Sequence, residues 1–205
     1  MNMHLIFWVC LLGMIAMVPL HFKSLEHDKL QRKYGQKKGI KIGEIYGLIS
    51  GWGFFGFWIG IWVSPQPRFT LPLSTRYSVN LSFLNLRIPL VHMAISFPFL
   101  AVGCWLGIQG VKMITLRASE THRTERIVTK GVYSIVRHPQ YLGGLLSHVG
   151  ITFLLSSLYS LIVTPLLTFL IYLIAIKEEK ELIKEFGEEY LNYKRKVPML
   201  IPKLR

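Results

Sequence analysis

Residues 142–176 read LGGLLSHVGITFLLSSLYSLIVTPLLTFLIYLIAI, a run of 35 residues without Asp, Glu, Lys or Arg. A bilayer core of roughly 30 Å is crossed by about 20 helical residues. The run is therefore too long for one crossing and suits two helices joined by a tight turn at residues 156–160. These residues predict a transmembrane helical hairpin from Leu142 to Ile176.

Three further stretches of suitable length carry no formal charge: Met1–Phe22, Ile45–Val63 and Ile88–Val111. The first lacks the basic start and the small-residue cleavage site of a signal peptide, so we interpret it as a retained helix. The sequence thus predicts an all-α integral membrane protein of about five transmembrane helices, with helices four and five forming the hairpin. The loop at 64–87 is expected to be irregular.

Charge and composition support this fold class. Hydrophobic residues make up 51% of the 205-residue chain, which excludes disorder, yet the formal net charge is +13. With five crossings, 21 of the 24 basic residues fall on the side of loops 23–44, 112–141 and 177–205. The positive-inside rule then predicts that this side is cytoplasmic and that the N-terminus lies outside. We attribute the charge to topology and lipid head groups and expect no nucleic-acid partner.

Polar residues cluster at the cytoplasmic ends of the hairpin. Arg137, His138 and Tyr141 surround the start of helix four, where Pro139 suits the first helical turn and free N–H groups favour an anionic ligand group. Glu178 and Glu179 follow helix five and return to the same membrane face. Beyond them, Leu182, Phe186 and Tyr190 recur at four-residue spacing, which indicates an amphipathic interfacial helix at the C-terminus.

These motifs resemble those of the isoprenylcysteine carboxyl methyltransferase family, which is related to phospholipid N-methyltransferases and small-thiol methyltransferases. The resemblance runs from Glu125 to Pro202 and rests on the following elements: Gly131-x-Tyr133, Arg137-His138-Pro139-x-Tyr141-x-Gly143, Glu178-Glu179, Phe186-Gly187-Glu188-Glu189-Tyr190-x-x-Tyr193, and Val197-Pro198 with Ile201-Pro202. It implies a single membrane domain over 1–205, in which 1–111 holds three transmembrane helices and 112–205 holds the cofactor-binding loop, the hairpin and the tail.

The resemblance implies an S-adenosylmethionine-dependent methyltransferase that acts on a lipophilic or lipid-modified acceptor. The implied cofactor-binding residues are Arg126, Ile127, Val128, Tyr133, His138, Pro139, Gln140, Tyr141 and Glu178. Helical motifs would form this site, since the chain has no G-x-G-x-x-G. For an amine acceptor, Glu179 is the expected general base.

One position departs from the family pattern. The family places a substrate-binding Arg four residues before the Glu pair, where this chain has Ile174. We expect Arg137, or alternatively Arg126, to replace it. The methyl acceptor therefore stays open between a prenylcysteine carboxylate, a phospholipid amine and a thiol.

Two other function classes fit parts of the sequence. Membrane sterol reductases, which bind NADPH, share an Arg-His-Pro-x-Tyr-x-Gly element, although the Glu pair and Phe186-Gly187-Glu188 favour the methyltransferase. A scaffold that binds anionic lipid explains the basic loops but not the His, Tyr and Glu motifs. No His pair has the spacing of a zinc helix, so we expect no metal, and the oligomeric state is left undetermined. Within helices three and four, His92 and His148 are expected to be neutral and hydrogen-bonded between helices.

Overall fold

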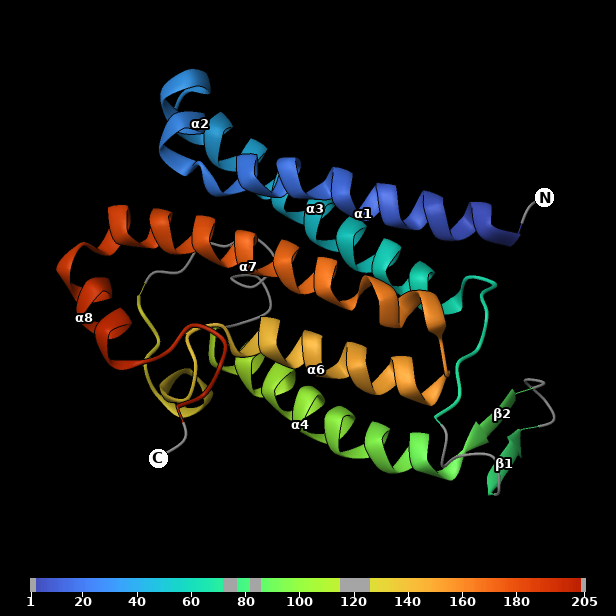
Figure 1. Ribbon diagram of the computed structural model, residues 1–205. Coiled ribbons are helices and arrows are strands. Elements are labelled where there is room, and N and C mark those ends of the chain that lie inside the picture. The colour runs from blue at the N-terminus through green and yellow to red at the C-terminus, as the bar shows by residue number, and fades with distance from the viewer. Residues whose placement is uncertain (1–2, 72–76, 82–85, 115–125, 204–205) are drawn as a thin grey trace.

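The computed structural model describes residues 3–71, 77–81, 86–114 and 126–203. Helices dominate these residues, as Figure 1 shows. The elements in chain order are α1 (Met3–Leu25), α2 (His27–Tyr34), α3 (Gln36–Val63), β1 (Ser78–Leu81), β2 (Leu86–Pro89), α4 (Leu90–Ile114), η2 (Gly131–Ser134), α6 (Pro139–Leu154), α7 (Leu158–Phe186) and α8 (Glu188–Lys196).

Four of the described helices, α1, α3, α4 and α7, are long and apolar enough to cross a membrane. This finding confirms the prediction of an all-α membrane protein with several crossings. The predicted helix four corresponds to α6, which has 16 residues and is not among these four.

Several boundaries differ from the prediction. The charged segment after α1 forms the short helix α2, and Gly35, with a φ of 80°, lets the chain turn into α3 nine residues before the predicted start at Ile45. The loop predicted to be irregular contains β1, which pairs antiparallel with β2 in the register Val79–Ile88. Ile88 therefore lies in a strand, and α4 begins at Leu90.

The helices pack as two pairs with α7 between them (Figure 1). On one side α1 packs on α3, and Met14, Ile61 and Leu167 form the fully buried centre of their contact with α7. On the other side α4 and α6 approach closely at their glycines. A Cβ atom on Gly143 would lie 2.6 Å from the carbonyl oxygen of Gly103, so only glycine permits this crossing.

Hydrogen bonds tie the turn between α6 and α7 to the end of α3. The Gln66 side chain accepts from the backbone N–H groups of Tyr159 (2.8 Å) and Ser160 (3.2 Å) and donates to the carbonyl oxygen of Ile61 (2.7 Å). One amide thus caps the start of α7 and the end of α3.

His148 is hydrogen-bonded between helices, as predicted. Its Nδ1 accepts from the indole N–H groups of Trp58 and Trp62, both at 2.8 Å, and its Nε2 lies 3.2 Å from the carbonyl oxygen of Ser160. Because indoles only donate, Nδ1 must carry the lone pair, and the ring is the neutral Nε2–H tautomer. The prediction also holds for His92, which bonds to Ser156 at 2.8 Å.

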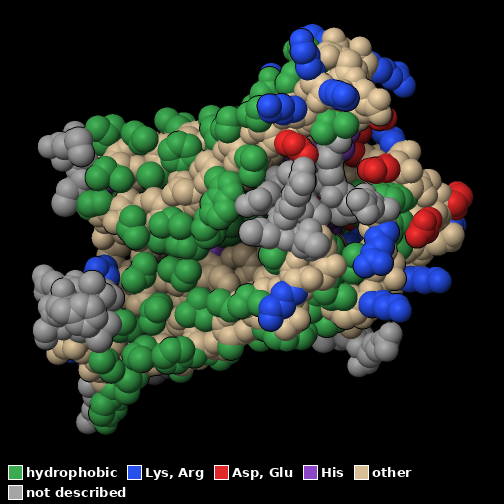
Figure 2. Space-filling view, turned by 180° about the vertical axis from the view of Figure 1, so that it is seen from behind, with side chains coloured by type: hydrophobic (Ala, Val, Ile, Leu, Met, Phe, Trp, Pro, Cys, Tyr) green, Lys and Arg blue, Asp and Glu red, His purple; other side chains and the backbone are tan. Residues whose placement is uncertain are grey.

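The molecule has two distinct ends. The N-terminus and the strands β1 and β2 lie at one end, and α2 and α8 lie at the other (Figure 1). Figure 2 shows the surface between them covered by hydrophobic side chains, with most of the visible Lys, Arg, Asp and Glu side chains gathered at the end of α2 and α8. The candidate site lies at this charged end.

Candidate active site

Four segments meet at the charged end: the residues before η2, the start of α6, the last turns of α7 and helix α8. Gly131 opens η2 with a φ of 58°, a conformation that favours glycine. His138 precedes α6 and Pro139 begins it, as the sequence predicts. Gly187, with a φ of 56°, ends α7 and turns the chain into α8, so the amphipathic stretch is two helices rather than one.

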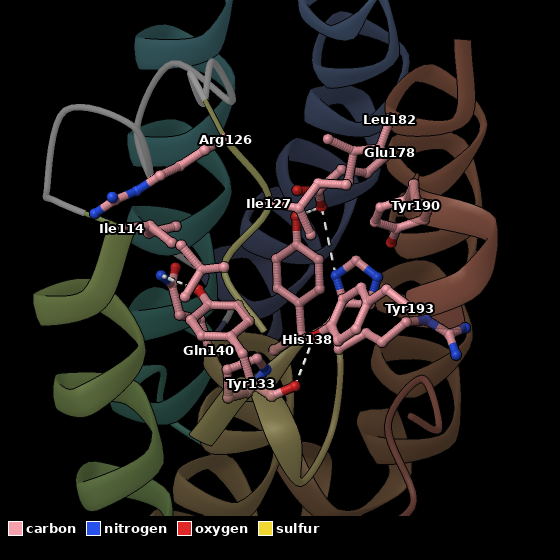
Figure 3. A pocket seen from close by; sticks show the side chains of 14 residues that line it. Ile114, Arg126, Ile127, Tyr133, His138, Gln140, Glu178, Leu182, Tyr190 and Tyr193 are labelled. Atoms are coloured by element: carbon pink, nitrogen blue, oxygen red, sulfur yellow. Dashed lines mark hydrogen bonds and ion pairs between the residues drawn. The ribbon is translucent and has the colours of Figure 1, made fainter. Parts of the chain in front are cut away.

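These segments enclose an open pocket with an empty volume of about 790 Å³, counting the part that faces solvent. Ten of its lining residues are predicted site residues, nine for the cofactor and one for the substrate: Arg126, Ile127, Val128, Tyr133, Arg137, His138, Pro139, Gln140, Tyr141 and Glu178. Figure 3 shows several of these side chains around the cavity. Glu125, where the resemblance begins, lies outside the described residues.

Sequence reasoning missed four lining residues: Ile114, Leu182, Tyr190 and Tyr193. Leu182 and Tyr190 belong to the amphipathic pattern, but that pattern alone pointed to the membrane interface. Leu182 lies on α7, one turn after Glu178, whereas Tyr190 and Tyr193 approach the pocket because the bend at Gly187 brings α8 back alongside the motif before α6. The combination of Gly187 with tyrosines on one helical face was the available signal.

Glu178 reaches the pocket from α7 and meets two aromatic side chains. Its Oε2 accepts a hydrogen bond from the Tyr141 hydroxyl at 2.8 Å and lies 3.6 Å from His138 Nδ1. The His138 and Tyr141 rings stack with an interplanar angle of 9°. A carboxylate and two parallel rings therefore share one wall of the pocket, a suitable surface for a ligand that is both cationic and aromatic.

Glu179 points away from the pocket and is only 1% exposed. Its carboxylate is 2.6 Å from Arg137 Nη2, 2.8 Å from Lys194 Nζ and 3.2 Å from His138 Nε2. Buried among these partners, the carboxylate is held in its ionised form and out of reach of a pocket ligand. The geometry thus favours a structural role for Glu179 over the general-base role expected from the sequence.

Arg137 lines the pocket, but its guanidinium group is already bonded on several sides. Besides Glu179, it donates to the backbone carbonyl oxygens of Val197 and, at 3.2 Å, Lys194. The side chain is buried. A substrate carboxylate would have to displace these acceptors, so Arg137 is poorly placed for the substrate-binding role expected of it.

The C-terminal segment fastens the motif before α6. The backbone N–H groups of Arg137 and His138 donate to the carbonyl oxygens of Pro198 (2.9 Å) and Met199 (3.2 Å). The Tyr193 hydroxyl donates to the carbonyl oxygen of Tyr133 at 2.6 Å. Val197 and Pro198 thus hold Arg137 in place through their backbone carbonyl oxygens, a contact that residue types alone do not reveal.

Burial raises the pKa of Tyr133, Tyr190 and Tyr193 above the ordinary tyrosine value. Nearby charged groups modify this effect, and the Glu179 carboxylate adds to it for Tyr190. The phenols stay protonated at neutral pH. They are therefore neutral hydrogen-bond donors and aromatic faces within the pocket.

The fold and the site define a class: a multi-pass helical membrane protein with a polar, aromatic pocket at one end of its helices. Residues 91–189 match the family model described as phospholipid methyltransferase. These residues span α4, the motif before α6, the α6 and α7 helices and the start of α8.

Curated relatives carry related names. The chain is 32% identical over 127 residues to protein-S-isoprenylcysteine O-methyltransferase of Schizosaccharomyces pombe, covering 59% of this chain and 54% of that protein. The Xenopus laevis protein of the same name is 39% identical over 85 residues, covering 41% and 30%. Methanethiol S-methyltransferase of Pseudomonas deceptionensis is 41% identical over 83 residues, covering 36% and 28%.

These matches agree with the resemblance to the isoprenylcysteine carboxyl methyltransferase family, and over residues 91–189 the chain is similar to the phospholipid methyltransferase family model. The chain spans about half the length of the Schizosaccharomyces pombe relative and a smaller share of the others.

Proposed function

We propose that the protein is an S-adenosylmethionine-dependent methyltransferase that acts at the membrane surface on a lipophilic acceptor. One observation carries the proposal. Two motifs that lie some 40 residues apart in sequence meet in a single pocket, where Glu178 of one motif contacts His138 and Tyr141 of the other. The names of the relatives, isoprenylcysteine O-methyltransferase and methanethiol S-methyltransferase, support the reaction type.

The pocket fits the chemical features of this cofactor, which supplies a methyl group on a sulfonium centre. Its cationic groups match the Glu178 carboxylate and the faces of Tyr133 and Tyr190. Its carboxylate matches Arg126 and the positive end of the α6 helix dipole. The remaining predicted contacts, Ile127, Val128, Pro139 and Gln140, would enclose the adenosine portion.

We further propose five crossings, with the N-terminus outside and the pocket and C-terminus in the cytoplasm. Helix α7 has 29 residues, about 43 Å, so its polar end extends beyond a bilayer core of roughly 30 Å. Helix α6, about 24 Å long, would make the fourth of these crossings, before α7, with local thinning of the bilayer. The two helices then act as a hairpin, and α8 lies at the interface.

Such a site delivers the cofactor from the cytoplasm and the acceptor from the lipid. Methyl transfer from a sulfonium requires alignment and exclusion of water more than activation of the leaving group. The buried ion pairs of Arg137 and the tail contacts keep the wall of the site rigid, which serves alignment.

Calorimetry on detergent-purified protein tests the cofactor. We expect S-adenosylmethionine to bind and NADPH not to, and Glu178→Gln to weaken binding about tenfold, the loss of one charge-assisted contact. The matched control Glu188→Gln makes the same chemical change on α8 at a side chain that is 77% exposed, and should leave the affinity unchanged. Binding of NADPH instead, or equal affinity in both variants, would contradict the proposal.

A further inference from the structure

The His138 ring lies between two carboxylates that come from adjacent residues of α7. Its Nε2 is 3.2 Å from Glu179 Oε1 on the buried side, and its Nδ1 is 3.6 Å from Glu178 Oε2 on the pocket side. Figure 3 shows the ring within the pocket and the dashed line that joins it to Glu178. The two nitrogens therefore have different surroundings: one is fixed in the protein and the other faces the cavity.

This arrangement selects a tautomer. Arg137 and Lys194 hold Glu179 as a carboxylate, which can only accept hydrogen bonds, so His138 Nε2 must carry a proton and donate it. In the neutral ring the lone pair then belongs to Nδ1 and faces the pocket. A buried carboxylate that orients a histidine in this way prepares it to take up a proton.

From this geometry, and resting on the proposed function, we infer that His138 is the proton acceptor of the reaction and that Glu179 positions it. The acceptor substrate is accordingly a nucleophile that must lose a proton, a thiol or an amine, rather than a carboxylate. A carboxylate is already ionised at neutral pH and has no use for such a base.

The cations of the pocket support the same substrate class. Among the described lining residues the cationic ones are Arg126 and Arg137, and Arg137 is bonded to Glu179 and to two backbone carbonyl oxygens. Ile174, where the family pattern has a substrate-binding Arg, is buried in the contact between helices. With Arg126 assigned to the cofactor, these residues leave a carboxylate acceptor without a cationic partner.

The step balances without a further reactant. The acceptor's electron pair forms the bond to the methyl carbon, and the pair of the broken S–CH₃ bond stays on the cofactor sulfur. The proton of the thiol or amine moves to His138 Nδ1. The resulting imidazolium faces Glu178 on one side and Glu179 on the other, and the stacked Tyr141 ring covers one face.

The test compares acceptors that differ in whether they need a base. Wild type and His138→Gln are given labelled S-adenosylmethionine with methanethiol, phosphatidylethanolamine, S-farnesylcysteine, or an aromatic thiol already ionised at neutral pH. We expect wild type to methylate methanethiol or phosphatidylethanolamine. His138→Gln should lower the kcat of this reaction by about 10²–10⁴-fold.

The pre-ionised thiol separates a base from a structural residue. If His138 accepts the proton, the variant loses at least tenfold more kcat on methanethiol than on this thiol, when each protein is saturated with S-adenosylmethionine as judged by calorimetry. Equal losses on both thiols, or farnesylcysteine as the only acceptor methylated, would overturn the inference. Failure of wild type to bind S-adenosylmethionine would instead refute the proposed function.

If His138→Gln does not fold, Glu179→Gln provides the second variant, because its amide can still accept from Arg137 and His138. It should lower kcat for the protonated thiol at least tenfold and spare the pre-ionised one. The same kcat as wild type on both thiols would exclude Glu179 as the positioning residue.

Discussion

Replacing Glu179 by Ala tests the most deeply buried charge cluster of the site. The carboxylate is 1% exposed and lies within 2.6–3.2 Å of Arg137, His138 and Lys194. Its removal leaves Arg137 buried with carbonyl oxygens as its remaining partners. Lys194, at 40% exposed, can turn to solvent and adds little.

The expected loss follows from this burial. Breaking a buried ion pair by removing one partner costs about 3–5 kcal/mol, because a charge is left without compensation. Removing both charged groups should cost less than removing one. We therefore expect Glu179→Ala to lower the free energy of unfolding by about 3–5 kcal/mol. The variant that carries both Arg137→Met and Glu179→Leu should have a free energy of unfolding closer to that of wild type than either single variant.

Reversible unfolding in mixed detergent micelles measures these free energies, and wild type, Arg137→Met, Glu179→Leu and the variant with both changes form a double-mutant cycle. The exposed pair of Arg195 and Glu188, 3.1 Å apart, provides a matched control whose coupling should stay below about 1 kcal/mol. A loss below about 1 kcal/mol for Glu179→Ala, or additive effects of the two core substitutions, would show that the cluster does not hold the site together.

Three further predictions concern stability. Gly143→Ala should cost about 1–3 kcal/mol in the same unfolding assay, because its Cβ would meet the α4 backbone at 2.6 Å, whereas Gly107→Ala has nothing within 4 Å and should change stability by less than about 0.5 kcal/mol. Gln66→Leu removes the shared cap of α3 and α7 and should cost about 1–3 kcal/mol; a neutral effect would disprove the capping role. Because the pKa of buried Tyr193 is raised, the unfolded chain releases a proton above about pH 10 that the folded chain keeps, so stability is complete below that pH and falls above it. Tyr193→Phe should make the fall in the free energy of unfolding less steep in an alkaline titration. An unchanged slope would contradict this prediction.

The short local motifs predicted more of the residues of the site than the hydropathy pattern did. Pro139 at a helix start and a charge-free run long enough for two helices are local properties, and they correctly indicated that His138, Tyr141 and Glu178 would meet. The β1 and β2 strands escaped prediction because each has only four residues, too few for their alternation of polar and apolar side chains to stand out, and Ile88 opens a charge-free run long enough for a helix. The break at Gly187 was missed because helical spacing continues across it in the sequence.

Hydropathy and charge distribution determined that this chain is a helical membrane protein, because the length of an apolar run is a property of the sequence itself. The motifs indicated most, but not all, of the residues that line its pocket. The tertiary structure decided what those residues can do. Arg137 and Glu179 look like site groups in sequence, yet they face each other and the tail, because a buried charge must find a partner wherever the fold supplies one. His138 keeps one nitrogen toward the cavity, and no sequence pattern distinguishes the two nitrogens of a histidine ring.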